Sequence, residues 1–224
     1  MYMDEVHGSL MMQADRVQAL LYQKYLKAFI TYENITRVET YPFPKMAVRE
    51  AIFNALAHSD WSANNPIQIR VEDDRLFISN SGLLTEGWTA ETLLSSHQSL
   101  LLNPNIANAF FRAGFIEAWG RGIEKMCTAC RNYGSPEPVY ITHPCDLMVR
   151  FDAAPSVMPF IEEERRKFEI SRDPHLGQVT GKVTGKVTDK VTDKVTDKVT
   201  DKVTGKSRII IEQFKTNPKT TIPS

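Results

Sequence analysis

Seven tandem tetrads with the pattern V-T-[GD]-K occupy residues 179–206 and limit what this chain can fold into. A helix would stack their valines at i and i+4, but valine, threonine and glycine are poor helix formers. An extended chain would place threonine and lysine on one face, which gives a half-polar strand of modest cohesion. We therefore interpret the repeat as a spacer, with self-association through the valines into a homo-oligomer as the alternative.

The composition allows one packed domain beside this repeat. A chain of 224 residues with 42% hydrophobic content can form a domain of about 150 residues plus an appendage. The formal net charge is zero, so the chain as a whole is not attracted to nucleic acid or to an acidic membrane. The N-terminus lacks the basic start and apolar run of a signal peptide, and no stretch is long enough to span a bilayer. We expect a cytoplasmic protein without a membrane partner.

Glu50 and Asn54 are the residues that point most directly to a function. They stand four residues apart, so on a helix they share one face, where an acid and an amide can hold a divalent cation and a water together. Proline at positions 42 and 44 favours a sharp entry to that helix. A buried stripe supports it and consists of Ala47, Val48, Ala51, Ile52, Ala55 and Leu56. Taken alone, such a pair is more often the solvated side of an amphipathic helix.

The flanking segments predict further elements. Alternating runs at 67–71 and 76–82, separated by the polar residues 72–74, indicate a β-hairpin. A helix is predicted over 123–133, and the glycines just before it, taken alone, are a helix break. Residues 11–30 have the spacing of an amphipathic helix, whose free face is a candidate for dimerisation.

Four motifs, in this order, resemble the histidine-kinase-like (GHKL) ATPase domain in the version found in RecG-like transcriptional regulators. The resemblance covers roughly residues 1–152, and the order is more specific than any single motif. The motifs are R-E-A-[IL]-x-N-A-[IL]-x-H-R-D-[YW] at 49–61, I-x-N-P-G-G-L at 78–84, R-N-P-x-[IL]-A at 102–107 and [YF]-I-E-x-W-G-x-G-I at 115–123. The last matches fully, whereas the first three depart at Ser59, at Ser81 and Leu83, and at Leu102.

This resemblance implies an α+β fold of the GHKL (Bergerat) type. It would be an α/β two-layer sandwich in which helices cover one face of a mixed, mainly antiparallel sheet. The implied cofactors are ATP and Mg²⁺. Glu50 would be the catalytic base that orients a water at the terminal phosphate, and Asn54 would hold the magnesium. A carboxylate can take a proton and an amide oxygen is a neutral hard ligand, so both residue types suit these roles.

The same resemblance implies the nucleotide contacts. Asn80 would sit where GHKL ATPases place an aspartate that reads adenine, and Gly82 would let the backbone approach the ring. Gly120 and Gly122 would form the loop around the phosphates. Glycines leave backbone N–H groups free to meet anionic oxygens, and the following helix would add its N-terminal dipole.

The departures from the motifs shape the predicted function. Ser59 and Leu102 each remove a positive charge, and Asn80 offers no charge, so we expect nucleotide binding with weak ATPase activity at most. The predicted protein is an ATP- and magnesium-binding regulatory domain of a DNA-binding transcriptional regulator. The alternative is a nucleotide-independent interaction or oligomerisation module with a degraded ATP site. A P-loop at 200–207 is rejected because position 200 is threonine, so no helicase motor is expected.

Two other features of the sequence have alternative interpretations. The cysteines at 127, 130 and 145, with His143, have a spacing that admits zinc, but Cys127 and Cys130 also look like core-facing residues of the predicted helix, which we favour. Residues 208–218 resemble the first helix and turn of a winged helix. The sequence ends before a recognition helix, so DNA binding is expected only through a fuller C-terminal domain.

We divide the chain into five parts. These are an N-terminal helical lead-in at 1–43, the ATP-binding domain at 44–152, a linker at 153–178, the tetrad repeat at 179–206 and a partial winged-helix-like segment at 207–224.

Overall fold

The computed structural model describes residues 3–82, 84, 87–95, 101–116, 121–172 and 207–211. Its strands are β1 (Met3–Val6), β2 (Phe29–Glu33), β3 (Thr36–Thr40), β4 (Ile67–Val71), β5 (Arg75–Ser81), β6 (Val139–Thr142), β7 (Asp146–Asp152) and β8 (Ser207–Ile211). Its α-helices are α1 (Leu10–Leu20), α2 (Lys45–His58), α3 (Ala90–Leu94), α4 (Pro104–Arg112), α5 (Gly122–Tyr133) and α6 (Met158–Arg172). A π-helical turn at Leu21–Tyr25 extends α1, and two 3-10 turns lie at Trp61–Ala63 and Pro155–Val157.

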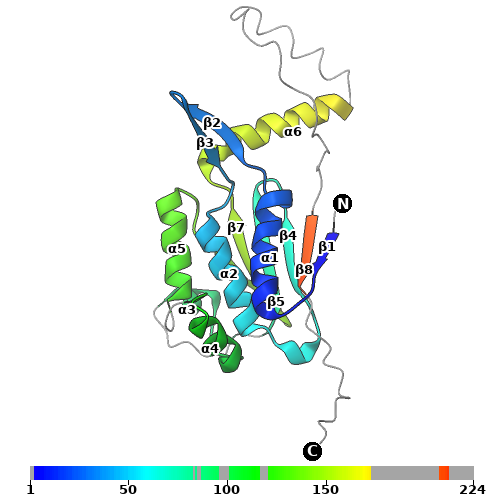
Figure 1. Cartoon of the computed structure of the whole chain (residues 1–224), viewed down its shortest axis with the longest axis vertical. Coiled ribbons are helices and arrows are strands. Elements are labelled where there is room, and N and C mark those ends of the chain that lie inside the picture. The colour runs from blue at the N-terminus through cyan, green and yellow to red at the C-terminus, as the bar shows by residue number, and fades with distance from the viewer. Residues whose placement is uncertain are drawn as a thin grey trace, which may run out of the picture.

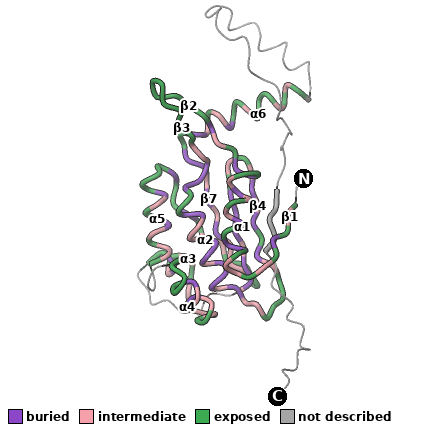
Figure 2. Tube along the Cα trace, viewed as in Figure 1, coloured by how far each residue is buried: buried purple, intermediate pink, exposed green. Residues whose placement is uncertain are grey.

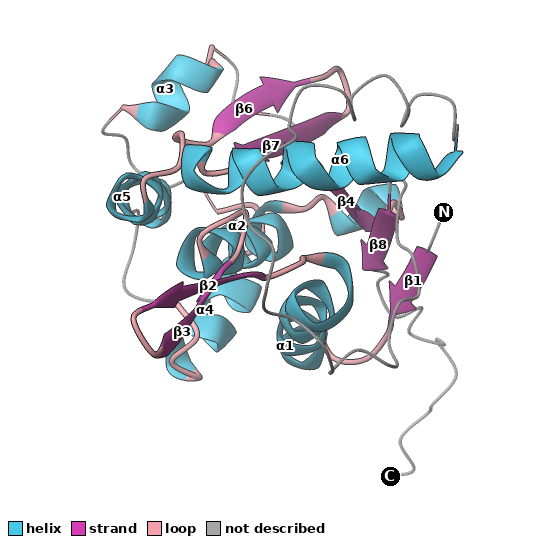
Figure 3. Ribbon diagram, turned by 90° about the horizontal axis from the view of Figure 1, so that it is seen from above, coloured by secondary structure: helices cyan, strands magenta, loops and turns pink. Residues whose placement is uncertain are grey.

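Helices and sheet form two layers. The six-stranded sheet has the order β1-β8-β4-β5-β7-β6, and every neighbouring pair is antiparallel except β1 with β8. Helices α1, α2 and α5 lie side by side over one face of this sheet (Figures 1 and 3). The predicted α+β class with a mixed, mainly antiparallel sheet is therefore confirmed.

The core lies between α2 and the central strands. Along β4 the burial alternates, so that Ile67, Ile69 and Val71 are buried while Gln68 is exposed, as expected for a strand with one covered face. Helix α2 buries the whole predicted stripe and also Phe53 and Ala57. Figure 2 shows this buried trace running through the centre of the molecule. The predicted hairpin is formed by β4 and β5, and the predicted helix over 123–133 is α5.

The N-terminal segment departs from the prediction of one helix over 11–30. The helical part ends at Tyr25, and Leu26 is already extended, with φ −95° and ψ 118°. Strand β2 follows and pairs with β3 in a separate two-stranded sheet. Aromatic and β-branched residues dominate the start of β2 and favour a strand, although their spacing continues the apolar face of α1.

The predicted linker at 153–178 begins with a packed helix. Val157 is fully buried, Ile161 of α6 is 3% exposed, and the Phe160 ring stacks on Phe29 at a centroid distance of 5.5 Å. The charged composition of this segment favours a linker, but Val157 and Ile161 belong to the hydrophobic core, and Met158 and Phe160 pack against it. Residues 153–172 therefore belong to the folded unit, and the rest of the predicted linker lies outside the described residues.

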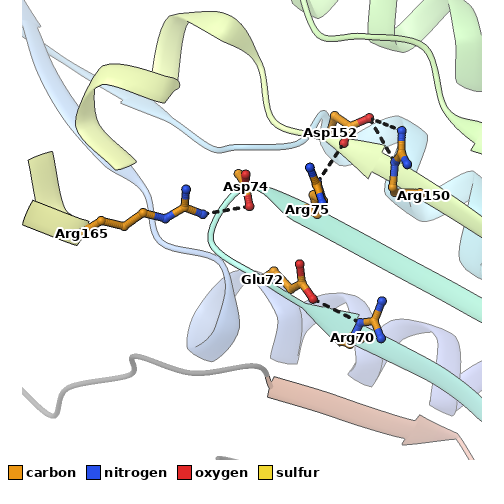
Figure 4. A network of polar contacts seen from close by, with 7 residues as sticks. All are labelled: Arg70, Glu72, Asp74, Arg75, Arg150, Asp152 and Arg165. Carbon is orange, nitrogen blue, oxygen red and sulfur yellow. Dashed lines mark hydrogen bonds and ion pairs between the residues drawn. The ribbon is translucent and has the colours of Figure 1, made fainter. Parts of the chain in front are cut away.

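Ion pairs join α6 to the ends of the strands (Figure 4). Arg165 of α6 lies 2.9 Å from the carboxylate of Asp74 in the β4–β5 turn. Next to it, Asp152 of β7 pairs with Arg150 at 3.0 Å and with Arg75 of β5 at 3.5 Å. These side chains are partly exposed, so each pair contributes roughly 0–1 kcal/mol and the apolar contacts dominate the docking of α6.

Strand β8 replaces the first helix that we predicted in the winged-helix-like segment. Residues 207–211 pair with β1 and β4, and the sequence Ile209-Ile-Ile explains the difference because β-branched residues fit strands better than helices. The tetrad repeat and residues 212–224 lie outside the described residues, so the spacer and the remainder of the winged-helix-like segment stay predictions.

Candidate functional site

A pocket of about 370 Å³ lies where α2, the sheet and α5 meet. Helix α2 contributes the polar residues Glu50, Asn54 and His58, which follow one another at intervals of one turn. The opposite wall is formed by apolar side chains from the sheet, which are Ile78, Leu147 and Val149, together with Tyr140. The pocket therefore has one polar side and one apolar side, which suits a ligand with a flat apolar part and a charged part.

Gly122 is packed against the two polar residues of α2. A Cβ atom on Gly122 would overlap Oε1 of Glu50 and would lie 3.1 Å from Oδ1 and 3.2 Å from Nδ2 of Asn54. Glycine at this position thus allows the first turn of α5 to approach the carboxylate and the amide. The approach places the free backbone N–H groups at the start of α5 next to both side chains.

The side-chain amide of Asn80 uses its nitrogen for contacts with the backbone, which leaves its carbonyl oxygen available to the pocket. Its Nδ2 group donates to the backbone oxygen of Ser81 at 3.1 Å and lies 3.5 Å from the backbone oxygen of His58. Two carbonyl oxygens on this side fix the orientation of the amide, because Oδ1 in the same place would be repelled by both. Asn80 lines the pocket and is 7% exposed. It therefore offers the pocket an acceptor, as an aspartate would, but without a charge.

Gly82 follows directly and requires glycine for two reasons. Its φ of +141° lies in a region that other residues rarely adopt, and a Cβ atom would come within 3.0 Å of the backbone oxygen of His58. The neighbouring backbone is tied to the end of α2, since the N–H of Asp60 donates to the oxygen of Ser81 at 2.7 Å. The end of β5 is thus held close to the end of α2, with Gly82 on the pocket wall.

Two other motif residues hold α2 to its neighbours. Asn103 donates from Nδ2 to the backbone oxygens of Ala57, at 3.0 Å, and Ser59, at 2.7 Å, and so satisfies carbonyl groups at the end of α2. Arg49 donates to the backbone oxygen of Phe115 at 2.7 Å and lies over the Phe53 ring. Both side chains brace the helix that carries Glu50.

The positions that lack the positive charge of the motifs differ in their relation to the pocket. Ser59 is fully buried and does not line the pocket. Leu102 does line the pocket and is 56% exposed. Sequence reasoning missed two cations on the same wall, Arg121 and Lys125, which flank Gly122 at the start of α5. The available signal was their position, with Arg121 inside the glycine motif and Lys125 two residues after it.

Tyr140 closes the pocket from the β6 side. Burial raises the pKa of its hydroxyl well above the ordinary value, and the nearby charges of Cys127 and Glu50 add to the shift. The phenol is therefore neutral and can donate a hydrogen bond. Burial also raises the pKa of the Cys127 and Cys130 thiols, which face the core from α5. Among the described residues there is no group of three or more histidine, cysteine or acidic side chains that could hold a metal ion.

Five of the six predicted site residues thus meet at one pocket. Glu50 and Asn54 come from α2, Asn80 and Gly82 from the end of β5, and Gly122 from the start of α5. Gly120 lies outside the described residues. The structure brings the five together from three separate segments of the chain, while the chemical role of each stays a prediction.

The family assignment rests on residues 64–151. They match the sequence profile of the family described as "Putative ATP-dependent DNA helicase recG C-terminal". This segment of the chain is a RecG C-terminal-like, ATPase-type domain. The recognition from the four motifs is confirmed for it, and Asn80, Gly82 and Gly122 lie inside the matched segment, whereas Glu50 and Asn54 precede it.

One solved structure supports the fold of this RecG C-terminal-like domain. The crystal structure of the DIP2311 protein from Corynebacterium diphtheriae superposes with a TM-score of 0.60 at 24% sequence identity, over 72% of this chain. The chain spans only 35% of the length of that protein. The similarity shows the fold alone. No curated protein matches the sequence.

None of the helices in the described part of the chain combines the length and the apolar character that a membrane span requires.

Proposed function

We propose that the pocket of this RecG C-terminal-like domain binds an adenine nucleotide together with magnesium, as the regulatory part of a DNA-binding transcriptional regulator. The observation that carries the proposal is the contact of Gly122 with Glu50 and Asn54. The close approach of a glycine to two polar side chains of another helix supports a ligand that contacts all three groups at one point.

The base would lie at the Asn80 end of the pocket. The outward carbonyl oxygen of Asn80 can accept a hydrogen bond from the exocyclic amino group of adenine. Guanine presents a carbonyl oxygen at the corresponding ring position, and two acceptors facing each other would leave both without a partner. We therefore expect a preference for adenine in spite of the missing aspartate.

The phosphates would lie at the start of α5. The N–H groups of its first turn favour an anion, and Arg121 and Lys125 line the same wall. These two cations compensate for the charge that Leu102 does not supply. Asn54 would hold magnesium through its amide oxygen, a hard neutral ligand of the kind that this ion accepts beside water and phosphate.

Glu50 would accept the proton of the water that attacks the terminal phosphate. Magnesium, when bound, neutralises charge on the phosphate oxygens. The side chains that stabilise the transferring phosphoryl group are Arg121 and Lys125, and the exposed position of Arg121 makes this stabilisation modest. Hydrolysis is therefore proposed to be slow, and the bound nucleotide acts as a switch.

Calorimetric titration with a non-hydrolysable ATP analogue, with and without magnesium, tests the proposal. Binding should require magnesium and should be lost in Asn54→Ala. The control is Asn105→Ala, an exposed residue of α4 that does not line the pocket and should leave binding unchanged. Absence of binding at millimolar nucleotide would favour the nucleotide-independent interaction module instead.

A further inference from the structure

Strand β8 fills a slot between two strands that do not touch each other. It pairs in parallel with β1, from Met3 with Arg208 to Val6 with Ile211, and antiparallel with β4, from Ile67 with Ile211 to Val71 with Ser207. Within the described sheet, β8 is the only neighbour of β1. If β8 leaves, a gap one strand wide remains, and its two sides carry unpaired backbone groups.

One side of this slot, β1, also has contacts that do not involve β8. Asp4 accepts hydrogen bonds from Lys24, at 2.6 Å, and from the hydroxyl of Tyr25. Val6 is buried in the hydrophobic core, and the backbone oxygen of Gly8 accepts from the side chain of Gln13 at 2.6 Å. Strand β1 is therefore anchored to the helical segment that follows it.

The other side of the slot, β4, is held by the core. Three alternate side chains of β4 are buried under the helices, and its second edge pairs with β5. Both sides thus have contacts of their own, and the slot between them accommodates one short extended segment. Such a site takes a strand by backbone hydrogen bonding along both edges.

The strand that fills the slot is separated from the rest of the domain by a long stretch of chain. Helix α6 ends at Arg172 and β8 begins at Ser207, which leaves the residues 173–206 between them. A stretch of this length can span up to about 110 Å, at roughly 3.3 Å per residue. A domain of about 150 residues has a radius of gyration of only about 15 Å. The covalent connection therefore lets the strand reach the slot of a neighbouring molecule.

We propose that the slot between β1 and β4 is a site for strand exchange, in which a second copy of this chain inserts its own residues Ser207–Ile211. The inserted strand makes the same backbone pairs in either molecule, so the exchange costs no contact. The balance between the two arrangements then depends on protein concentration relative to the effective concentration of the tethered strand, which is on the order of 1 mM. This self-association uses the sheet and is independent of the nucleotide pocket.

Disulfide trapping distinguishes exchange between molecules from insertion within one. Gln68 of β4 lies opposite Ile210 of β8, so Gln68→Cys and Ile210→Cys place two thiols at partner positions. The background carries Cys145→Ser, because Cys145 is exposed whereas the other two cysteines are buried. The two single variants are mixed at protein concentrations from about 10 µM to about 1 mM and oxidised gently with oxidised glutathione.

The expected result is a covalent heterodimer of the two variants whose yield rises at least tenfold over this concentration range. Excess synthetic peptide with the sequence of residues 206–212 should suppress it. In the control, Ser207→Cys replaces Ile210→Cys; Ser207 pairs with Val71, about 10 Å along the strand from Gln68, so no disulfide should form.

Two results would overturn the proposal. If the double variant forms its disulfide within one chain while the mixture yields no heterodimer at about 1 mM, the strand is confined to its own molecule. If neither the double variant nor the mixture forms the disulfide, the slot does not hold this strand at all. Neither result depends on whether a nucleotide binds.

Discussion

Replacing Gly122 by alanine should separate the nucleotide site from the stability of the fold. The new Cβ atom would overlap Oε1 of Glu50 and press on the amide of Asn54. The carboxylate is the end of a flexible side chain and will move away, which breaks the arrangement of Glu50, Asn54 and the start of α5. Loss of one hydrogen bond to a charged group costs about 1.5–3 kcal/mol, so the dissociation constant for the magnesium–nucleotide complex should rise about 10- to 150-fold.

Gly122→Ala should leave the thermal stability unchanged or slightly higher. Gly122 is the first residue of α5 and its φ is not positive, so alanine fits the helix and lowers the entropy of the unfolded chain. The gain is at most about 1 kcal/mol, or about 2–4 °C in Tm for a domain of this size. Calorimetric titration and a thermal melt on the same sample give both quantities.

The matched control is Gly134→Ala at the other end of the same helix. Gly134 has a φ of +75°, and a Cβ atom there would meet nothing within 4 Å. Alanine should cost about 1 kcal/mol through backbone strain, which lowers Tm, but should leave nucleotide binding unchanged. The reasoning is refuted if Gly122→Ala binds the nucleotide as tightly as the original chain, or if both variants lose binding in proportion to their loss of stability.

Three further predictions concern the base, the pH dependence and α6. In competition titrations the protein should prefer ATP over GTP by about fivefold or more, since a mismatched buried acceptor costs about 1–3 kcal/mol. Asn80→Ala should lower this ratio, and equal affinities before mutation would contradict the assigned orientation of the amide. A hydrogen bond from Lys24 and, with a smaller effect, one from the Tyr25 hydroxyl lower the pKa of the Asp4 carboxyl below its ordinary value of 3.8. The ionised carboxyl therefore stabilises the fold above that pH, and this contribution is lost as the pH falls through the lowered pKa. Because the pair is partly exposed to solvent, Asp4→Asn should reduce the free energy of unfolding by only about 0.5 kcal/mol at pH 7. Urea titrations should show the difference vanishing well below pH 3.8, and a constant difference would exclude the ion pair. Ile161→Ala should cost about 2–4 kcal/mol and Arg165→Ala about 1 kcal/mol or less, measured by chemical denaturation, and the reverse order would mean that charge rather than apolar contact holds α6.

Local patterns in the sequence predicted the central part of the fold. The alternation at 67–71 and 76–82 fixed both strands of the hairpin, and the stripe from Ala47 to Leu56 fixed the buried face of α2. In β4 buried residues alternate with more exposed ones, so its periodicity is visible without knowledge of its neighbours, whereas in β5 Leu76, Phe77 and Ile78 are all buried.

The elements that were missed depend on distant partners. The apolar spacing of α1 continues into β2, but the first residue of β2, Phe29, packs on Phe160 of α6. Helix α6 itself has so few apolar residues that its docking is not apparent from composition. Strand β8 owes its place to β1 and β4, which are far away in the sequence. Local patterns do not encode such contacts.

For the candidate site, the sequence predicted most of the residues but not the contacts between them. The spacing of Glu50 and Asn54 gave their common face, and the motif gave Gly122, but only the packing of α5 against α2 shows that Gly122 touches both side chains. The orientation of the Asn80 amide likewise depends on two backbone carbonyl groups that the fold brings to it. Arg121 and Lys125 were overlooked because charged residues at a helix start are usually solvated.

The parallel pairing of β1 with β8 determines how the domain would respond to a pulling force. Met3 lies beside Arg208 and Val6 beside Ile211, so the chain enters β1 at one end of the pair and leaves β8 at the other. Tension applied between residues 3 and 211 would slide the two strands along each other and load all of their hydrogen bonds at once, whereas an antiparallel pair held at one end would open bond by bond. Any module attached on either side would thus be connected through a mechanically resistant link.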